Sequence, residues 1–233
     1  MAGCCPVVEL RQYTLRPGQR DVLIELFDRE FVESQEAVGM EVIGQFRDLD
    51  RPDRFVWLRG FPDMERRREA LGAFYGGPVW KANSQAANAT MIDVDDVLLL
   101  RPVPLTTGDG TSEFDPQPPR PAPGARAAAS VIVATICALD GPADLAAVEG
   151  ALLPALAATA SPPLATFVEE PSANTFPALP VRTGEHVIVW IQRVPSDDAQ
   201  ASAGGELARD LLPGVVGVPL QLRLEPTPRS RLR

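Results

Sequence analysis

The sequence predicts an α+β fold in which a βαββαβ unit occurs twice. Short runs alternate apolar and polar residues as strands do, helical patterns separate several of these runs, and the same order returns after a central stretch rich in proline, glycine and alanine. We therefore expect one domain over residues 1–103, a linker over 104–129, a second domain over 130–226 and a disordered basic tail over 227–233.

The first unit shows both kinds of pattern in the expected order. Strand patterns fall at residues 7–15, 41–49, 54–61 and 94–103. Helical patterns fall at residues 21–39, 64–75 and 79–91. Pro17 and Gly18 end the first strand, and Pro52 marks a hairpin turn. Asp63 is placed to cap the second helix. This order is that of the ferredoxin-like fold.

The second unit repeats the order less clearly. Strand patterns fall at residues 130–139, 164–170, 185–194 and 219–226, and helical patterns at 141–160 and, weakly, 197–212. The best internal match aligns FVWLRGFPDMERR with VIVWIQRVPSDDAQ, which pairs Trp57 with Trp190 and Arg59 with Gln192. The match lies at the third strand of each unit, so duplication is the favoured interpretation.

Composition and missing motifs exclude several classes of function. The formal net charge of -9 disfavours a nucleic-acid partner and an anionic membrane surface. No apolar run is long enough to span a bilayer, so we expect a cytoplasmic protein. There is no phosphate-binding glycine loop, nucleophile elbow or catalytic triad. The single histidine belongs to no cluster at metal-ligand spacing, so we expect no metal site. We expect no other cofactor either, and the sequence leaves a haem ligand as an open alternative without support.

Four segments together resemble the NIPSNAP family, within the dimeric α/β-barrel superfamily of ferredoxin-like domains. They are ELRQYTLRPG, GQFRDLDRPDRFVWLRGFPDMERR, AFYGGPVWKANSQAANATM and VLLLRP, and the resemblance covers residues 7–103. It implies that two such domains pack sheet against sheet into a barrel, by dimerisation or within one fused chain, which leaves a homo-oligomer open. The superfamily includes cofactor-free monooxygenases, isomerases, dehydratases, haem proteins and non-catalytic members, so the resemblance does not imply one reaction.

Strand alternation places a mixed polar and aromatic set of side chains on one face of each predicted sheet. Glu9 shares a face with Arg11 and Tyr13, whereas Val8 and Leu10 share the opposite face, which we expect to pack on helices. The polar face would then line the space between the two sheets. The candidate pocket residues are Glu9, Arg11, Tyr13, Gln45, Trp57, Arg59, Phe61, His186, Trp190 and Gln192.

The residue types suggest roles and a plain alternative. Arg59 could hold a carboxylate, enolate or phenolate, while His186 or Tyr13 could move a proton. The alternative is that Glu9 pairs with Arg11 or Arg59 in a structural ion network. The expected partner is a small organic molecule. Three functions remain. The first is a cofactor-independent tailoring enzyme of secondary metabolism that performs proton transfer, isomerisation or oxygenation. The other two are a non-catalytic ligand-binding protein and a protein-interaction scaffold.

The remaining features have simpler interpretations. The basic run ERRRE at residues 65–69 is expected to be a solvated helix face with local ion pairs. Trp80 is expected to plug the core beneath the first sheet. Tyr75, before the Gly-Gly-Pro break, could belong either to that core or to a lid hinged at Gly76 and Gly77.

Overall fold

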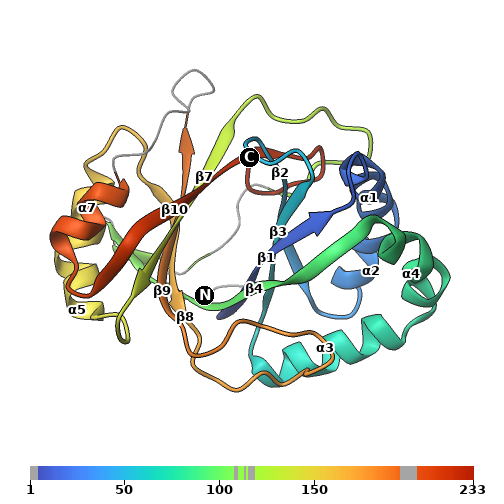
Figure 1. Cartoon of the computed structure of the whole chain (residues 1–233), viewed down its shortest axis with the longest axis horizontal. Coiled ribbons are helices and arrows are strands. Elements are labelled where there is room, and N and C mark those ends of the chain that lie inside the picture. Colours follow the sequence, from blue (N-terminus) through green and yellow to red (C-terminus); the bar gives the residue numbers. More distant parts are fainter. Residues whose placement is uncertain (1–4, 108–109, 113, 115–118, 195–203) are drawn as a thin grey trace.

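Eight strands of the chain close into one barrel, with helices on two opposite outer sides (Figure 1). The computed structural model describes residues 5–107, 110–112, 114, 119–194 and 204–233. The barrel strands are β1 (Val7–Leu15), β2 (Glu41–Asp48), β3 (Arg54–Phe61), β4 (Met91–Val103), β7 (Val131–Leu139), β8 (Pro163–Glu169), β9 (His186–Val194) and β10 (Val215–Pro226). The predicted α+β class is confirmed, and the sheet is a closed barrel.

Each half of the chain contributes four neighbouring strands to the barrel. Their order is β4-β1-β3-β2 in the first half and β10-β7-β9-β8 in the second. The halves join where β2 pairs with β10 and where β4 pairs with β8, and both pairings are antiparallel. One chain therefore supplies every strand that the barrel needs.

Helices cover the outside of each half. The first half carries α1 (Arg20–Leu26), η1 (Phe27–Phe31), α2 (Val32–Glu36), α3 (Met64–Gly76) and α4 (Pro78–Thr90). The second half carries α5 (Leu145–Ala147), η2 (Val148–Leu152), α6 (Leu153–Ala157) and α7 (Gly204–Leu211). In both halves a π-helical turn, η1 or η2, interrupts the first helical region.

The predicted cap of α3 is confirmed, because the Asp63 carboxylate accepts the backbone N–H of Arg66 at 2.7 Å. The first part of the expected helix over 197–212 lies outside the described residues. The stretch expected as a linker contains the short hairpin strands β5 (Leu105–Thr107) and β6 (Gly110–Ser112). Among the described helices, none combines the length and apolar character that a bilayer crossing requires.

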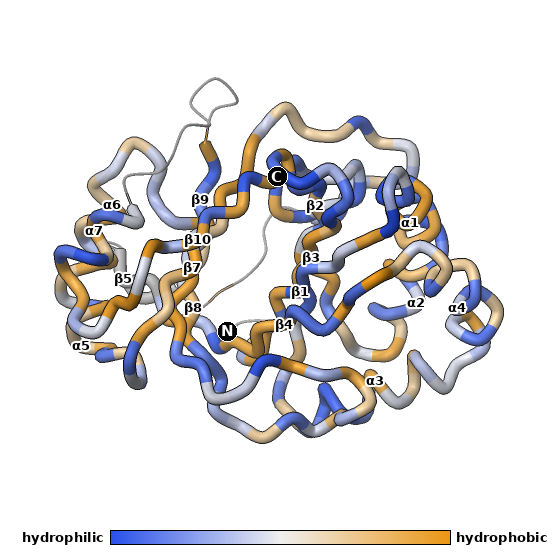
Figure 2. Tube along the Cα trace, in the orientation of Figure 1, coloured by the Kyte–Doolittle hydropathy of each residue, from blue (hydrophilic) through white to orange (hydrophobic). Residues whose placement is uncertain are grey.

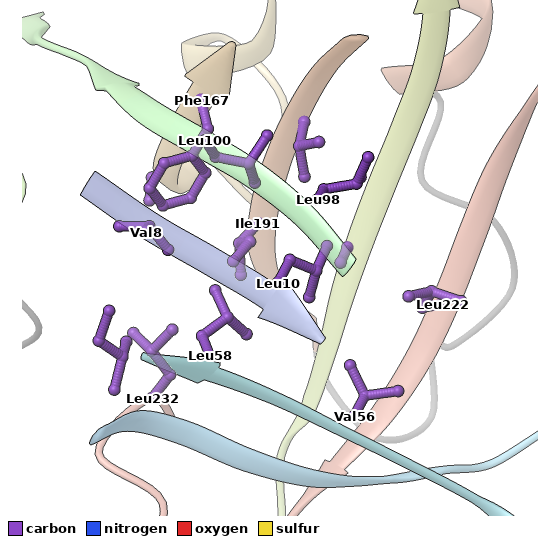
Figure 3. Packing of buried hydrophobic residues seen from close by; sticks show 14 of the residues in the cluster. Val8, Leu10, Val56, Leu58, Leu98, Leu100, Phe167, Ile191, Leu222 and Leu232 are labelled. Carbon is purple, nitrogen blue, oxygen red and sulfur yellow. The ribbon is translucent and has the colours of Figure 1, made fainter. Parts of the chain in front are cut away.

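The barrel interior is packed with apolar side chains from all eight strands. Hydrophobic residues run along these strands (orange in Figure 2). Figure 3 shows Val8, Leu10, Leu58, Leu98 and Phe167 pointing toward one another inside the barrel. The barrel interior is therefore a hydrophobic core, whose packing supplies much of the stability of such a fold.

The expected orientation of the two sheet faces is wrong. Val8 and Leu10 point into the barrel, whereas Tyr13 and Trp57 pack against the helices of the first half. Trp190 likewise packs against the helices of the second half. The strands surround the centre of the interior with apolar side chains, while the helices bring polar side chains that can pair with charged groups on the outer face. The candidate residues therefore cannot line a space between the two sheets.

A bulge in β2 also changes the alternation expected for that strand. The register of β2 against β3 shifts between Val42 and Gly44, so Ile43 and Phe46 both join the barrel core while Gln45 turns to the helix side. A Cβ atom on Gly44 would lie 2.5 Å from the Phe46 ring. Only glycine fits this close approach without movement of the ring.

The C-terminal tail is ordered, which corrects the expectation that it is disordered. The backbone N–H of Thr227 donates to Gln45 at 2.8 Å, and that of Leu232 donates to Ile43 at 3.2 Å. Leu232 is buried in the barrel core (Figure 3). The tail therefore extends the β10 to β2 contact and covers one end of the barrel, which a charge count alone does not reveal.

Candidate functional site

Glu9 lies at the centre of a buried ion cluster on the helix side of β1. Its carboxylate accepts from Arg11 Nη1 at 2.6 Å, Arg59 Nε at 2.8 Å and Arg67 Nε at 2.7 Å. All four side chains are fully buried. Glu9 thus contacts both arginines that the ion-network interpretation names, and a third arginine from α3 joins them.

The cluster holds more positive than negative charge. Burial alone would raise the pKa of Glu9, but the charges of Arg59, Arg11 and Arg67 outweigh burial and hold that pKa well below its ordinary value. Glu9 is therefore ionised, and three guanidinium groups surround one carboxylate. Among the described residues, Nη2 of Arg59 and Nη2 of Arg67 have no hydrogen-bond partner. The region next to the cluster is consequently favourable for an anion or a strongly polarised oxygen.

Arg67 was missed because the basic run was interpreted as a solvated helix face. Arg66 and Arg68 do pair with acidic residues of the same helix in solvent. Arg67 instead lies on the buried face of α3 with Leu71 and Phe74. These three positions lie four and then three residues apart, which is the spacing of one face of a helix, so this periodicity indicated that Arg67 is buried.

Tyr13 connects the cluster to the space beneath the helices. Its hydroxyl oxygen accepts from Arg11 Nε at 3.1 Å. Among the hydrogen bonds found between described residues, none has this hydroxyl as its donor. Burial raises the pKa of Tyr13 above its ordinary value, although the charge of Arg11 opposes this effect. Tyr13 is thus a neutral phenol near pH 7, with a hydrogen available to donate to a ligand oxygen.

An aromatic pocket lies beside Tyr13, between the first sheet and its helices. Its cavity volume is about 90 Å³. A cavity needs roughly 10–15 Å³ in this measure to hold one water, so there is room for several waters or for an aromatic ring. The lining residues are Tyr13, Leu23, Phe27, Phe31, Gln35, Trp57, Phe74, Tyr75, Trp80, Asn88, Met91, Val94 and Leu179. Trp80 was expected to plug the core beneath the first sheet. It packs against that core while half-buried, and together with Tyr75 it also lines this pocket.

Besides Tyr13, two side chains, Gln35 and Trp57, connect the pocket to the cluster. Gln35 lines the pocket and accepts from Arg59 Nη1 at 3.1 Å. The Arg59 guanidinium lies over the Trp57 ring at 5.0 Å from its centroid and over the Phe61 ring at 5.6 Å. This stacking explains why an arginine shares a strand face with two large aromatic residues. Arg59 therefore contacts two residues of the pocket wall, Gln35 through a hydrogen bond and Trp57 through the stacking of its guanidinium on the ring.

The equivalent place in the second half lacks the ion cluster. In the first half Arg11 faces Trp57 across the β1–β3 ladder, and in the second half Thr135 faces Trp190 across β7–β9. By the same register, Val133 and Gln192 occupy the places of Glu9 and Arg59.

The second-half equivalent is also closed. Trp190 Nε1 donates to Gln192 Oε1 at 3.2 Å, and a Cβ on Gly204 would lie 2.9 Å from the Trp190 ring. Trp57 Nε1, by contrast, has no partner among the described residues. Trp190 and Gln192 therefore form a packed contact, and the open pocket belongs to the first half.

His186 lies outside the cluster and the aromatic pocket. Its Nδ1 is 2.9 Å from Glu169 Oε1, and the two side chains are 37% and 17% exposed. They line a separate groove of about 500 Å³ with Arg101 and Arg182. No lining residue is common to this groove and the aromatic pocket. His186 thus has a carboxylate partner of its own but does not join Arg59 and Tyr13.

Gln45 also lies away from the cluster. Its Nε2 donates to Asp28 Oδ1 at 3.4 Å. Asp28 faces a hollow of about 820 Å³, which residues 123–125 of the expected linker and Pro228–Arg229 of the tail help to enclose. Burial raises the pKa of Asp28 to about 6, although Arg229, Arg120 and Arg47 oppose this shift. No group of three or more histidine, cysteine, aspartate or glutamate residues within the described ranges could hold a metal ion.

The fold and the buried cluster define an α/β-barrel protein with a polar and aromatic layer between one sheet and its helices. Residues 8–106 match the sequence model of the NIPSNAP family. The chain therefore carries a NIPSNAP domain in its first half, as the sequence resemblance indicated. A comparison with curated proteins gave no match.

Two solved structures resemble nearly the whole chain. A "putative monooxygenase" from Lactobacillus acidophilus is 12% identical, with a TM-score of 0.53, and the match covers 95% of this chain and 94% of that one. A "putative monooxygenase" from Fusobacterium nucleatum is 8% identical, with a TM-score of 0.53, covering 97% and 94%. A NIPSNAP-like domain protein from Burkholderia xenovorans is 26% identical, with a TM-score of 0.39, over 42% of this chain and 84% of that one. At such identities the two long matches establish the fold and no more.

Proposed function

We propose that the first half of the chain binds a small aromatic molecule that carries one anionic or strongly polarised oxygen. The observation that carries this proposal is the aromatic pocket beside Tyr13, whose hydroxyl oxygen accepts from Arg11 and leaves its own hydrogen available. Aromatic walls suit a planar ring, and a phenol supported by a buried cationic cluster suits a carboxylate, phenolate or enolate oxygen. The binding place is the layer between sheet and helices, instead of the space between the two sheets.

The catalytic form of this proposal is a cofactor-independent tailoring reaction. Tyr13 would donate a hydrogen bond to the substrate oxygen, and the positive charge of Arg11 and Arg59 would stabilise negative charge that develops there. Such an arrangement suits proton transfer, isomerisation, or oxygenation of an enolate-like substrate. The names of the two long structural matches support oxygenation as the first reaction to assay. Oxygen uptake with a bound ligand would separate this form from non-catalytic binding.

The binding test uses 2-naphthoate as a probe, measured by isothermal titration calorimetry. Tyr13→Phe keeps the ring but removes the hydroxyl, so we expect about tenfold weaker binding, which corresponds to one hydrogen bond of roughly 1–1.5 kcal/mol. Met91→Ala should weaken binding too, because Met91 lines the pocket. Ile92→Ala is the matched control, since Ile92 is the next residue on β4 and is 61% exposed. Equal binding by the Tyr13→Phe and wild-type proteins would contradict the proposal.

We also propose that the barrel arose from two tandem ferredoxin-like repeats. The support is the same strand succession in each half and a π-helical turn in the first helical region of each. Under this proposal Val133 and Gln192 are the counterparts of Glu9 and Arg59. The binding chemistry is then specific to the first repeat.

A further inference from the structure

The long loop between β8 and β9, residues 170–185, crosses from the second half onto the first. The backbone N–H of Glu170 donates to Leu99 at 2.9 Å, and that of Arg182 donates to Val97 at 2.9 Å. Both acceptors belong to β4 of the first half. In Figure 1 the loop runs beneath the barrel and beside α3. The loop is thus anchored at both ends on the half that carries the pocket.

The middle of this loop is bonded to the ion cluster. Arg67 Nη1 donates to Asn174 Oδ1 at 2.9 Å and to Thr175 Oγ1 at 3.3 Å. The same arginine donates through Nε to Glu9. Thr175 Oγ1 in turn donates to the backbone oxygen of Met64 at 2.9 Å. Arg67 therefore connects the β8–β9 loop directly to the buried carboxylate.

The next residues of the loop form a wall of the aromatic pocket. Leu179 lines the cavity, and the Phe176 ring stacks on Tyr75 with centroids 6.1 Å apart. Asn174 fixes this turn, because its Oδ1 also accepts from the Phe176 N–H at 3.0 Å and its Nδ2 donates to the Leu179 backbone oxygen at 2.9 Å. One amide side chain thus joins the arginine, the aromatic stack and the pocket wall.

We propose that the second half of the chain caps the pocket of the first half, and that residues 174–179 determine which ligands enter. This inference rests on the proposed binding function and adds a role for the half whose own equivalent site is closed. The cap presents Leu179 at the pocket, and Phe176 stacks on Tyr75 of the pocket wall, so the ligand class is an aromatic anion with an apolar end that faces the loop. The oxygen end would face Tyr13.

The first experiment compares Asn174→Ala with Ser172→Ala in the full chain. Ser172 is an exposed residue of the same loop that does not line the aromatic pocket. In Asn174→Ala we expect amide hydrogen exchange at residues 174–180 to become at least tenfold faster, and 2-naphthoate to dissociate several-fold faster in stopped-flow fluorescence. Ser172→Ala should match the wild-type protein in both measurements.

The second experiment tests selection by size and does not depend on the Asn174 variant being well folded. Leu179→Ala enlarges the pocket wall, so the affinity ratio of 2-naphthoate to benzoate should rise at least threefold over wild type. Wild type could bind 2-naphthoate while Asn174→Ala leaves its dissociation rate unchanged or Leu179→Ala leaves the affinity ratio unchanged. In either case the proposal that residues 174–179 form a cap is wrong, and the proposed binding function stands. If wild type binds neither probe, the proposed function fails and the cap fails with it.

Discussion

At the residue scale, the charge balance of the outer face of the first sheet depends on Glu9. It compensates part of the charge of Arg11, Arg59 and Arg67, and none of these four side chains contacts solvent. Removing one partner of a buried ionic group leaves uncompensated charge in a medium that solvates it poorly. Glu9 therefore contributes to folding as well as to any ligand binding.

We expect Glu9→Gln to lower the free energy of unfolding by about 3–5 kcal/mol at pH 7, because three buried guanidinium groups lose their carboxylate. Urea denaturation monitored by tryptophan fluorescence measures this change. Glu69→Gln is the control, since Glu69 pairs with Arg66 on the exposed face of α3 and should change stability little. A Glu9→Gln protein as stable as wild type would show that the cluster is not held by this charge.

The pH dependence of the same variant gives a second, signed measurement. The folded-state pKa of Glu9 lies below the ordinary value of 4.5, so its contribution is complete above about pH 4.5 and is lost as the pH falls further. The difference in unfolding free energy between wild type and Glu9→Gln should therefore be constant from pH 7 to pH 5 and shrink at pH 4 and pH 3. A difference that grows in acid would contradict this assignment.

At the element scale, the sequence predicted the strands, the cap of α3 and the sharing of faces well, because these depend on local alternation and turn residues. The prediction of which face points into the barrel was wrong. Alternation separates Glu9 and Arg11 from Val8 and Leu10, but the choice of inside depends on whether helices or strands provide partners for the polar set. The bulge at Gly44 was likewise invisible, because one extra residue changes the faces without changing composition.

The composition of the tail gave no indication that the tail packs on the barrel. Residues 227–233 contain several arginines, yet Leu232 lies in the barrel core and is 3% exposed. Its neighbours Thr227 and Ser230 bond to the backbone of Gln45 in β2. These contacts are long-range, so no local pattern could indicate them.

We expect Leu232→Ala to lower the free energy of unfolding by about 2–3 kcal/mol, since it removes buried methyl groups and leaves a cavity at one end of the barrel. Urea denaturation midpoints with an unchanged slope would measure it. Arg233→Ala, one residue further along, is the control and should be nearly neutral. A loss below about 0.5 kcal/mol would mean that the tail does not pack on the barrel in solution.

At the scale of the whole molecule, the closed barrel makes each half depend on the other. The inner faces of both sheets form one hydrophobic cluster. The edges of β2 and β4 pair with β10 and β8, and they also bond to the tail and to the β8–β9 loop, all of which belong to the second half. Neither half can bury its apolar face or satisfy its edge strands alone. The division of the chain by composition near residue 104 does not make the halves independent.

An isolated fragment of residues 1–103 should therefore self-associate instead of remaining a monomer. We expect a dimer by size-exclusion chromatography with light scattering, because a second copy can cover Val8, Leu10 and Leu58 and pair the free edges of β2 and β4. The full chain, measured at the same concentration, is the reference. A stable monomeric fragment would contradict the dependence of the two halves on each other.

Joining both halves in one polypeptide also removes a constraint that symmetry imposes. In a barrel built from two identical chains, any substitution appears on both outer faces at once. Here Val133 stands at the position that matches Glu9 and Thr135 at the one that matches Arg11, so charge can accumulate on one side while the other stays uncharged at these positions. The second half, for its part, extends residues 170–185 onto β4 of the first half. Two different halves in one chain thus allow division of labour between the two outer surfaces of the barrel.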